Sequence, residues 1–355
     1  MVKSIIQKST LAVAASAVMS IPAIANDTQA KSSDDIFKAF GQVNVSIDNS
    51  SENGPGAEEG TSFKSNSSRL GMMGSMKTYL EGTKLIYKAA IQYESVGEND
   101  QNFLFRDALV GLKNKKLGAV RLGRLTTGYK SSYTKIDPWT DHILQARQSG
   151  QQGASNLNAN YFNNAIDYTS PKMAGFQVSA FYSMLPDDSS ERLHNAGKLK
   201  DYKGGSATGI GIKYFLEGLR LTADVLDVDA DDTGSLTNGA AQKIGAQYKF
   251  KNGLTLAGHY EDVTELKLGT NIWAHASYKV GKHGLVTASY GINEGDPSDN
   301  VYTSDTKGDA TTWSIGGKYM LTKNSALIVG YNDHDRDGGD DAQTFTVGID
   351  AKFGY

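Results

Sequence analysis

Several segments of the chain alternate between polar and apolar residues, and charged residues occupy some of the polar positions. Basic residues at such positions include Arg69, Lys84, Lys88 and Arg121. A separate segment, Asp137-Pro138-Trp139-Thr140-Asp141, supplies two carboxylates. Fixed charges of opposite sign on facing surfaces create a field that orients dipolar solutes, and groups of like charge bias the choice of ion. These residues therefore indicate selection of solutes rather than bond making, although Asp137 and Asp141 could equally cap a turn or a short helix.

The elements that would position these charges are β-strands, because a period of two residues runs from Ile36 to the end of the chain. In the first segment one face carries Phe37, Ala39, Val43, Val45 and Ile47, and the other carries Lys38, Gln42, Asn44, Ser46 and Asp48. The first face suits lipid and the second suits water. Helical periodicity is nearly absent, so a chain that enters a membrane in this way must cross it as strands.

Fifteen further segments repeat the pattern, which makes sixteen in all. They are Ser68–Lys77, Thr83–Ser95, Phe103–Lys113, Gly118–Leu125, Asn164–Ser170, Phe176–Met184, Ala207–Leu216, Leu219–Val228, Ala241–Phe250, Leu254–Thr264, Asn271–Val280, Leu285–Asn293, Thr311–Leu321, Ser325–Asp333 and Thr344–Tyr355. A closed antiparallel barrel of a bacterial outer membrane needs an even number. The predicted fold is therefore all-β, a 16-stranded antiparallel transmembrane β-barrel.

The connections between these segments alternate between short and long. The short ones, such as Glu217-Gly218 and Lys251 to Gly253, mostly contain glycine, as tight turns do. The long polar ones include Ser50 to Ser67 and Thr126 to Asn163. We expect the short turns to face the periplasm and the long loops to face the outside of the cell.

The N-terminus has the features of an export signal. Lys3 and Lys8 precede an apolar stretch, and Ala23-Ile24-Ala25 matches a cleavage site. We therefore predict a cleaved signal peptide at residues 1–25 and a transmembrane barrel domain at residues 26–355. Removing both lysines takes the formal net charge from -3 to -5, so a nucleic-acid partner is not expected. The chain has no cysteine, which excludes disulfides and cysteine-based metal sites.

Several segments resemble the Gram-negative general porin family, in particular its neisserial and β-proteobacterial branch. They are Phe40-Gly41-Gln42-Val43-Asn44, Ser68-Arg69-Leu70-Gly71, the runs 105–112 and 117–124, and the run 164–171. The resemblance implies a homotrimer of 16-stranded barrels in the outer membrane, with the third outer loop folded into each channel. It also implies that the C-terminal strand is recognised by the barrel-assembly machinery. The chain departs from the family at Met72-Met73 and Met76-Lys77, where a basic residue and an acidic pair are common, and at Tyr355, where Phe is usual.

The loop from Thr126 to Asn163 is too long for a hairpin and would narrow a wide aqueous barrel if it folded into the lumen. We then expect a passive diffusion channel for ions and small hydrophilic solutes, with Asp137 and Asp141 on the loop side of its constriction. The opposite basic wall would consist of Arg69, Lys84, Lys88 and Arg121. Because the loop also carries cations of its own, such as Lys130 and Arg147, the balance favours a weak preference for anions.

Two further arginines occupy positions that the alternation assigns to the lipid-facing side of their strands. Arg106 and Arg124 each lie near a strand end, where a β-bulge can redirect a side chain. We include Arg124 in the predicted constriction and leave Arg106 out.

Two other classes of protein also fit parts of the pattern. An outer-membrane barrel hydrolase would use a nucleophile beside histidine and a carboxylate, and His259, Glu261 and His275 share one face, but no serine near them has a nucleophile's context. We interpret these residues as lumen lining. A secreted β-rich adhesin would not need alternating short and long turns.

No cofactor is expected. The run Asp333 to Gly338 matches the opening of a calcium loop, but position 12 is Thr344 instead of glutamate. We interpret it as an acidic outer loop that meets divalent cations shared with lipopolysaccharide.

Overall fold

The computed structural model describes residues 36–97, 103–185, 204–231, 237–295, 309–337 and 341–354. The predicted signal peptide at 1–25 lies outside the described residues. Within the described ranges, no helix is long and apolar enough to cross a membrane.

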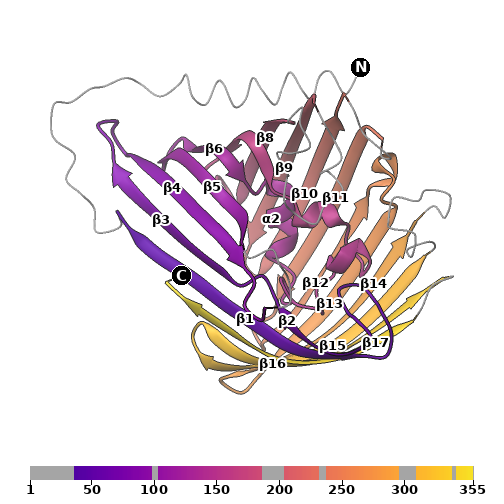
Figure 1. The fold of residues 1–355 in the computed structure, drawn as a ribbon. Coiled ribbons are helices and arrows are strands. Elements are labelled where there is room, and N and C mark those ends of the chain that lie inside the picture. The colour runs from indigo at the N-terminus through magenta and orange to yellow at the C-terminus, as the bar shows by residue number, and fades with distance from the viewer. Residues whose placement is uncertain are drawn as a thin grey trace.

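One antiparallel sheet curls around a central space (Figure 1). Its strands are β1 Lys38–Ser50, β2 Gly60–Ser65, β3 Arg69–Lys77, β4 Thr83–Tyr93, β5 Phe103–Asn114, β6 Gly118–Leu125, β7 Phe162–Thr169, β8 Phe176–Met184, β9 Ser206–Leu216, β10 Leu219–Asp229, β11 Gly239–Lys249, β12 Leu254–Asp262, β13 Thr270–Val280, β14 Gly284–Glu294, β15 Ala310–Thr322, β16 Ser325–Arg336 and β17 Ala342–Phe353. β2 pairs with the C-terminal half of β1, and β3 pairs with its N-terminal half. β2 and β3 therefore lie end to end and together form one strand of the wall. The described residues thus form the predicted sixteen-stranded wall.

The barrel closes where its first and last strands meet. β1 pairs with β17 from Gly41 opposite Phe353 to Asn49 opposite Phe345, and each strand from β4 to β16 pairs with both of its neighbours in sequence. Within the part of the chain that the structure describes, this closure leaves no long sheet edge with unpaired backbone groups, which a lipid environment would penalise by several kcal/mol per group.

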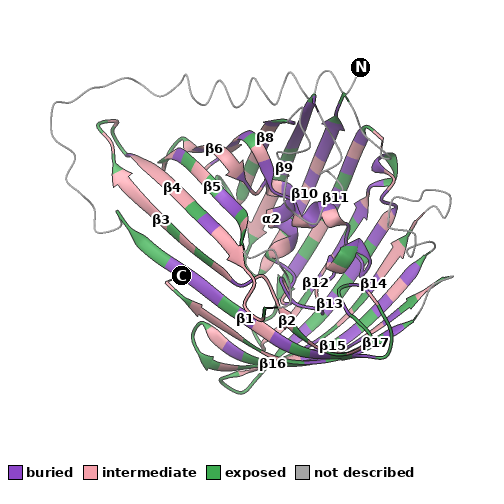
Figure 2. Cartoon of the chain, in the orientation of Figure 1, coloured by how far each residue is buried: buried purple, intermediate pink, exposed green. Residues whose placement is uncertain are grey.

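The predicted period of two is present in the wall and sets an inside-out distribution of polarity. In β1, Asp48 is only 2 % exposed whereas its neighbour Ile47 is 39 % exposed. Buried and exposed bands alternate along the strands in Figure 2. Polar side chains therefore point inward, and apolar side chains form the outer surface.

Two predicted loops contain regular structure. The first outer loop, expected from Ser50 to Ser67, includes β2, which satisfies its backbone groups by pairing with the end of β1. The long loop from Thr126 to Asn163 includes α2 Gly128–Thr134 and two 3-10 turns, η1 Gln148–Gly150 and η2 Asn156–Ala159. A third turn, η4 Thr264–Leu266, lies between β12 and β13.

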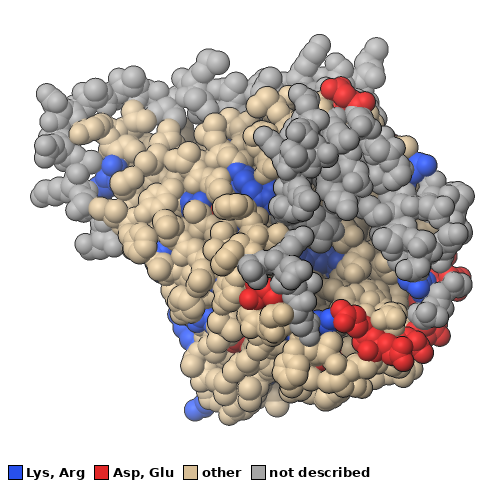
Figure 3. Space-filling view, viewed as in Figure 1, with Lys and Arg blue, Asp and Glu red and all other residues tan. Residues whose placement is uncertain are grey.

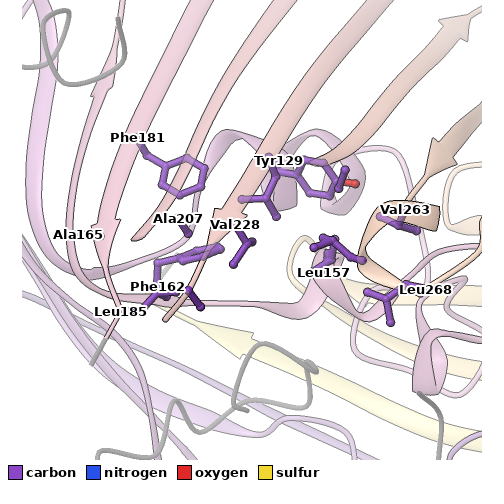
Figure 4. Packing of buried hydrophobic residues seen from close by; sticks show 14 of the residues in the cluster. Tyr129, Leu157, Phe162, Ala165, Phe181, Leu185, Ala207, Val228, Val263 and Leu268 are labelled. Atoms are coloured by element: carbon purple, nitrogen blue, oxygen red, sulfur yellow. The ribbon is translucent and has the colours of Figure 1, made fainter. Parts of the chain in front are cut away.

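The main apolar core forms between this long loop and the wall. Tyr129 of α2 and Leu157 of η2 are buried in one cluster with Phe162, Phe181 and Val228 from three strands. Figure 4 shows these side chains gathered between the loop and the ends of the strands. The loop therefore supplies packing that the wall cannot provide alone.

The closing seam can be tested with two glycines. A Cβ at Gly348 of β17 would lie 2.5 Å from the carbonyl oxygen of Val45, in the backbone of β1, whereas a Cβ at Gly317 of β15 would meet nothing closer than 3.6 Å. Gly348→Ala should overpack the seam at a cost of roughly 1–3 kcal/mol, while Gly317→Ala should be close to neutral. The measurement is the temperature at which folded barrel converts to unfolded chain in detergent electrophoresis. Equal conversion temperatures for the two variants would contradict the importance of this seam.

Candidate functional site

The long loop is fixed to the inner face of the wall by polar contacts. Lys213 donates to Ser131 Oγ (2.6 Å), Lys243 to the Tyr129 carbonyl (2.6 Å), His259 to the Gly153 carbonyl (2.9 Å), His275 to the Ile136 carbonyl (3.0 Å), and the Trp139 indole to Thr287 Oγ1 (2.7 Å). These wall residues belong to β9, β11, β12, β13 and β14. The loop leaves the wall at β6 and reaches β14, which is eight positions away in a ring of sixteen. It therefore extends to the opposite side of the barrel.

Glu261 is the main buried anchor of the loop. Its carboxylate accepts hydrogen bonds from the Ser155 backbone amide (2.8 Å), from Asn158 Nδ2 (2.9 Å) and from the Tyr129 hydroxyl. Burial, together with the charge of Glu261, raises the pKa of Tyr129 and keeps its hydroxyl protonated as a donor. Because Glu261 and His259 are both engaged by the loop, they hold it in place and match the predicted lumen-lining role.

Asp137 stabilises the tip of the loop, residues 137–141, through contacts within the loop itself. Its carboxylate accepts from the backbone amides of Trp139 (2.7 Å) and Ala146 (3.1 Å) and from the Tyr133 hydroxyl. These contacts correspond to the capping alternative considered for this residue.

Asp141 connects the loop tip to the wall. It forms a salt bridge with Arg69 of β3 (2.8 Å) and another with Arg147 of the loop (2.7 Å). Burial alone would raise the pKa of Asp141, but the charges of Arg69, Arg106 and Arg147 outweigh burial and hold that pKa well below its usual value. The carboxylate is therefore ionised throughout the physiological range.

A β-bulge turns Arg106 into the lumen, contrary to the predicted alternation. The pairing of β4 with β5 shifts register between Ala89 and Ile91, and both Arg106 and Asp107 are buried. Arg106 donates to Gln92 Oε1 (2.6 Å), and Asp107 forms a salt bridge with Lys88 (2.6 Å). Two adjacent charged residues of one strand cannot both face inward in regular geometry, and that adjacency was the signal for a bulge.

Arg124 lies beside a second irregularity and joins a basic cluster. The pairing of β6 with β7 shifts register between Gly123 and Leu125. The Arg124 guanidinium lies 5.2 Å from the centre of the Tyr161 ring. The Arg106 guanidinium (5.4 Å) and the Lys130 ammonium (3.6 Å) are also close to this ring. Cations within about 6 Å of an aromatic face are attracted by its negative quadrupole. No pattern in the sequence marks Tyr161 as the centre of this group.

Lys130 has an unusual environment within this cluster. Burial and the charges of Arg147 and Arg106 lower its pKa well below the usual range for lysine. Its ammonium nitrogen donates to the Ala159 carbonyl (2.6 Å), which joins the two ends of the long loop.

The remaining predicted residues lie apart from the Arg69–Asp141 contact. Arg121 pairs with Asp167 of β7 (2.8 Å). Lys84 is the second residue of β4, and Arg69 pairs opposite Gln92 near the other end of that strand. Lys84 and Gln92 are eight positions apart in the strand, a distance of about 26 Å at the usual rise. The structure therefore does not bring Lys84 to the contact between loop and wall.

The acidic run after Asp333 is extended, since β16 continues to Arg336. Among the described residues there is no group of three or more side chains arranged to hold a metal ion.

Comparison with known proteins places these features in a family. The model of the Gram-negative porin family matches residues 10–339. The chain is 25% identical to the major outer membrane protein P.IB of Neisseria sicca, over 74% of this chain and 78% of that protein. It is 27% identical to an outer membrane porin protein of Bordetella pertussis, over 52% of this chain and 50% of that one.

Solved structures show the same fold. The anion-selective porin from Comamonas acidovorans aligns with a TM-score of 0.71 at 20% identity, covering 91% of this chain and all (100%) of that one. OmpF of Salmonella typhi aligns with a TM-score of 0.68 at 18% identity, over 89% and 97% of the two chains. Neither the barrel hydrolase nor the secreted adhesin is favoured by these matches. This chain belongs to the Gram-negative porin family, and it is a channel of the outer membrane rather than an enzyme.

Proposed function

We propose that this porin forms a water-filled passive diffusion channel for ions and small hydrophilic solutes, and that the loop at 126–163 narrows it to an eyelet. The observation that carries the proposal is the salt bridge between Asp141 at the loop tip and Arg69 on the wall. A sixteen-stranded barrel is too wide for its own side chains to fill. A loop that extends from β6 to β14 and then contacts β3 therefore divides that space.

Charges around the eyelet favour weak anion preference. Arg69, Lys88, Arg121 and Arg124 are the proposed wall cations, and Asp137 and Asp141 are the proposed loop carboxylates. Arg106 joins them because the bulge in β5 directs it inward. Asp141 and Asp107 are both paired with cations, so the arginines near Tyr161 leave an excess of positive charge. Such an excess concentrates anions in a water-filled constriction.

The cellular setting of the channel is part of the proposal. Residues 1–25 act as a cleaved signal, and residues 26–355 form the barrel domain. The mature chain assembles as a homotrimer, contacts outer-membrane lipid and lipopolysaccharide, and is inserted by the barrel-assembly machinery through its C-terminal strand. The apolar outer face of β17, where Phe345, Val347 and Phe353 are each about half exposed, supports contact with lipid.

Planar-bilayer recording tests the proposal directly. Purified protein should produce discrete conductance steps that appear and close in groups of three. A reversal potential measured in a salt gradient should have the sign of anion preference. A folded barrel that never conducts, or that cleaves lipid or peptide, would overturn the proposed function.

Asp141→Asn should loosen the loop tip. The substitution leaves Arg69 and Arg147 without their buried anionic partner, a change that typically costs about 3–5 kcal/mol. We expect noisier open-channel current and a larger conductance step. The matched control is Glu217→Gln, since the Glu217–Lys251 pair spans 3.5 Å with side chains that are 83% and 94% exposed, and such pairs contribute little. Equal noise and step size in the two variants would show that the salt bridge does not shape the channel.

The eyelet should be insensitive to mild acid. A carboxylate with a depressed pKa stabilises the folded state at pH values above its ordinary 3.8, and the contribution is lost only as pH falls through the lower folded value. Burial lowers the pKa of His142, also in the loop, to about 3, so it stays neutral over the same range. The step size should therefore be constant when recordings are made from neutral pH down to about pH 5. A transition centred near pH 6 would assign control of the eyelet to an ordinary histidine instead.

A further inference from the structure

Three lysines lie side by side on the wall at the end of the barrel that carries the short turns. Lys77 of β3 pairs in register with Lys84 of β4, and Lys84 pairs in register with Lys113 of β5. Neighbouring strands are about 4.8 Å apart, so these flexible side chains can converge on one solute. We call Lys77, Lys84 and Lys113 the lysine row.

The lysine row faces the lumen. Lys77 lies on the same face of β3 as Arg69, which contacts the loop, because an even number of positions separates them. For the same reason Lys84 lies on the same face of β4 as Lys88, which contacts Asp107. Residues directly opposite one another on neighbouring strands share a face, so Lys113 points inward as well.

The three ammonium groups have no acidic partner among the described residues. Salt bridges join Arg69, Lys88 and Arg121 to carboxylates, but none joins a member of the lysine row to any residue that the structure describes. Glu81, in the turn between β3 and β4, is exposed and forms no salt bridge with a described residue either. Like charges directly opposite on neighbouring strands destabilise a sheet, and a bound anion would relieve that repulsion.

The opposite end of the barrel carries the other sign of charge. Asp333 and Asp335 lie in the last four residues of β16, which ends at Arg336, and Asp337 follows it. Asp309 and Asp341 directly precede β15 and β17, so five carboxylates outnumber the one arginine here. Figure 3 shows acidic atoms gathered beside the outer ends of β15 and β17. An anion that approaches from this side meets repulsion before it can reach the lysine row.

We infer that the lysine row is a binding site for multivalent anions of the polyphosphate or polycarboxylate class at the periplasmic mouth, separate from the eyelet. It captures such anions from the short-turn side and makes the channel respond to them asymmetrically. This inference rests on the proposed function only for its effect on current. Binding itself needs no conduction.

The first test is electrical and uses inorganic triphosphate in bilayers of phosphatidylcholine, which removes anionic lipid as a competing source of phosphate. Triphosphate added to one side should block single channels at least about tenfold more often than when it is added to the other, the lower end of the range for electrostatic steering. The triple variant K77Q/K84Q/K113Q should lose this difference, and raising the salt should weaken it in the unmodified protein. Equal blocking from both sides, or undiminished asymmetry in the triple variant, would overturn the inference.

A matched control removes the same charge at the same end of the barrel. K115Q/K282Q/K323Q changes three exposed lysines of the turns and should leave the asymmetry intact. Removing the lysine row relieves repulsion and should not lower the temperature of barrel unfolding. The single variant K84Q, at the centre of the row, provides a second test with a smaller change and should reduce the asymmetry.

The second test does not depend on conduction. In detergent-solubilised barrels, triphosphate should protect Lys77, Lys84 and Lys113 from acetylation, as measured by mass spectrometry, and should leave Lys115, Lys282 and Lys323 reactive. Protection without any channel current would support the lysine row and count against the proposed function. Current without protection would do the reverse.

Discussion

The pairing of β1 with β17 is the constraint on which the rest of the molecule depends. In lipid, an unpaired backbone group has no water to bond, so a membrane sheet must close on itself. Closure through Gly41 to Asn49 gives every wall strand two partners and fixes an inside and an outside. Once the wall has an inner and an outer face, successive residues of each strand face water and lipid in turn. The charges that define the channel are the polar half of this alternation.

The long loop solves a second problem that closure creates. A ring of sixteen strands encloses more space than inward side chains can fill. The loop has little regular structure of its own, and its longest helix, α2, has only seven residues. Its position therefore depends on buried anchors, chiefly Glu261 on one side and the Arg69–Asp141 pair on the other. Buried charges are costly unless paired, so these anchors specify one arrangement of the loop more than they add to total stability.

The sequence predicted the wall well, because alternation is a local property that each strand repeats. Gln42 and Asn44 inward, with Val43 outward, follow from spacing alone. It predicted less where long-range pairing overrides local pattern. Nothing in the polar first outer loop indicated β2, which exists because the end of β1 offers unpaired backbone groups. The helix α2 has no amphipathic signature beyond Tyr129 and Tyr133, and tertiary packing of these two rings stabilises it. Tyr161 acquires its cationic neighbours only through folding of the loop.

The irregular positions of the wall are also where the charges of the site gather. In a regular strand one residue of every adjacent pair faces lipid, so Arg106 and Asp107 could not both point into a water-filled lumen. The bulge in β5 brings both inside, and the shift beside Gly123 in β6 leaves Arg124 near the same ring. Both irregularities lie close to the base of the long loop. A charge that violates the period of two in a barrel strand is therefore evidence for a bulge, and a bulge beside a long loop is where lumen charges should be sought.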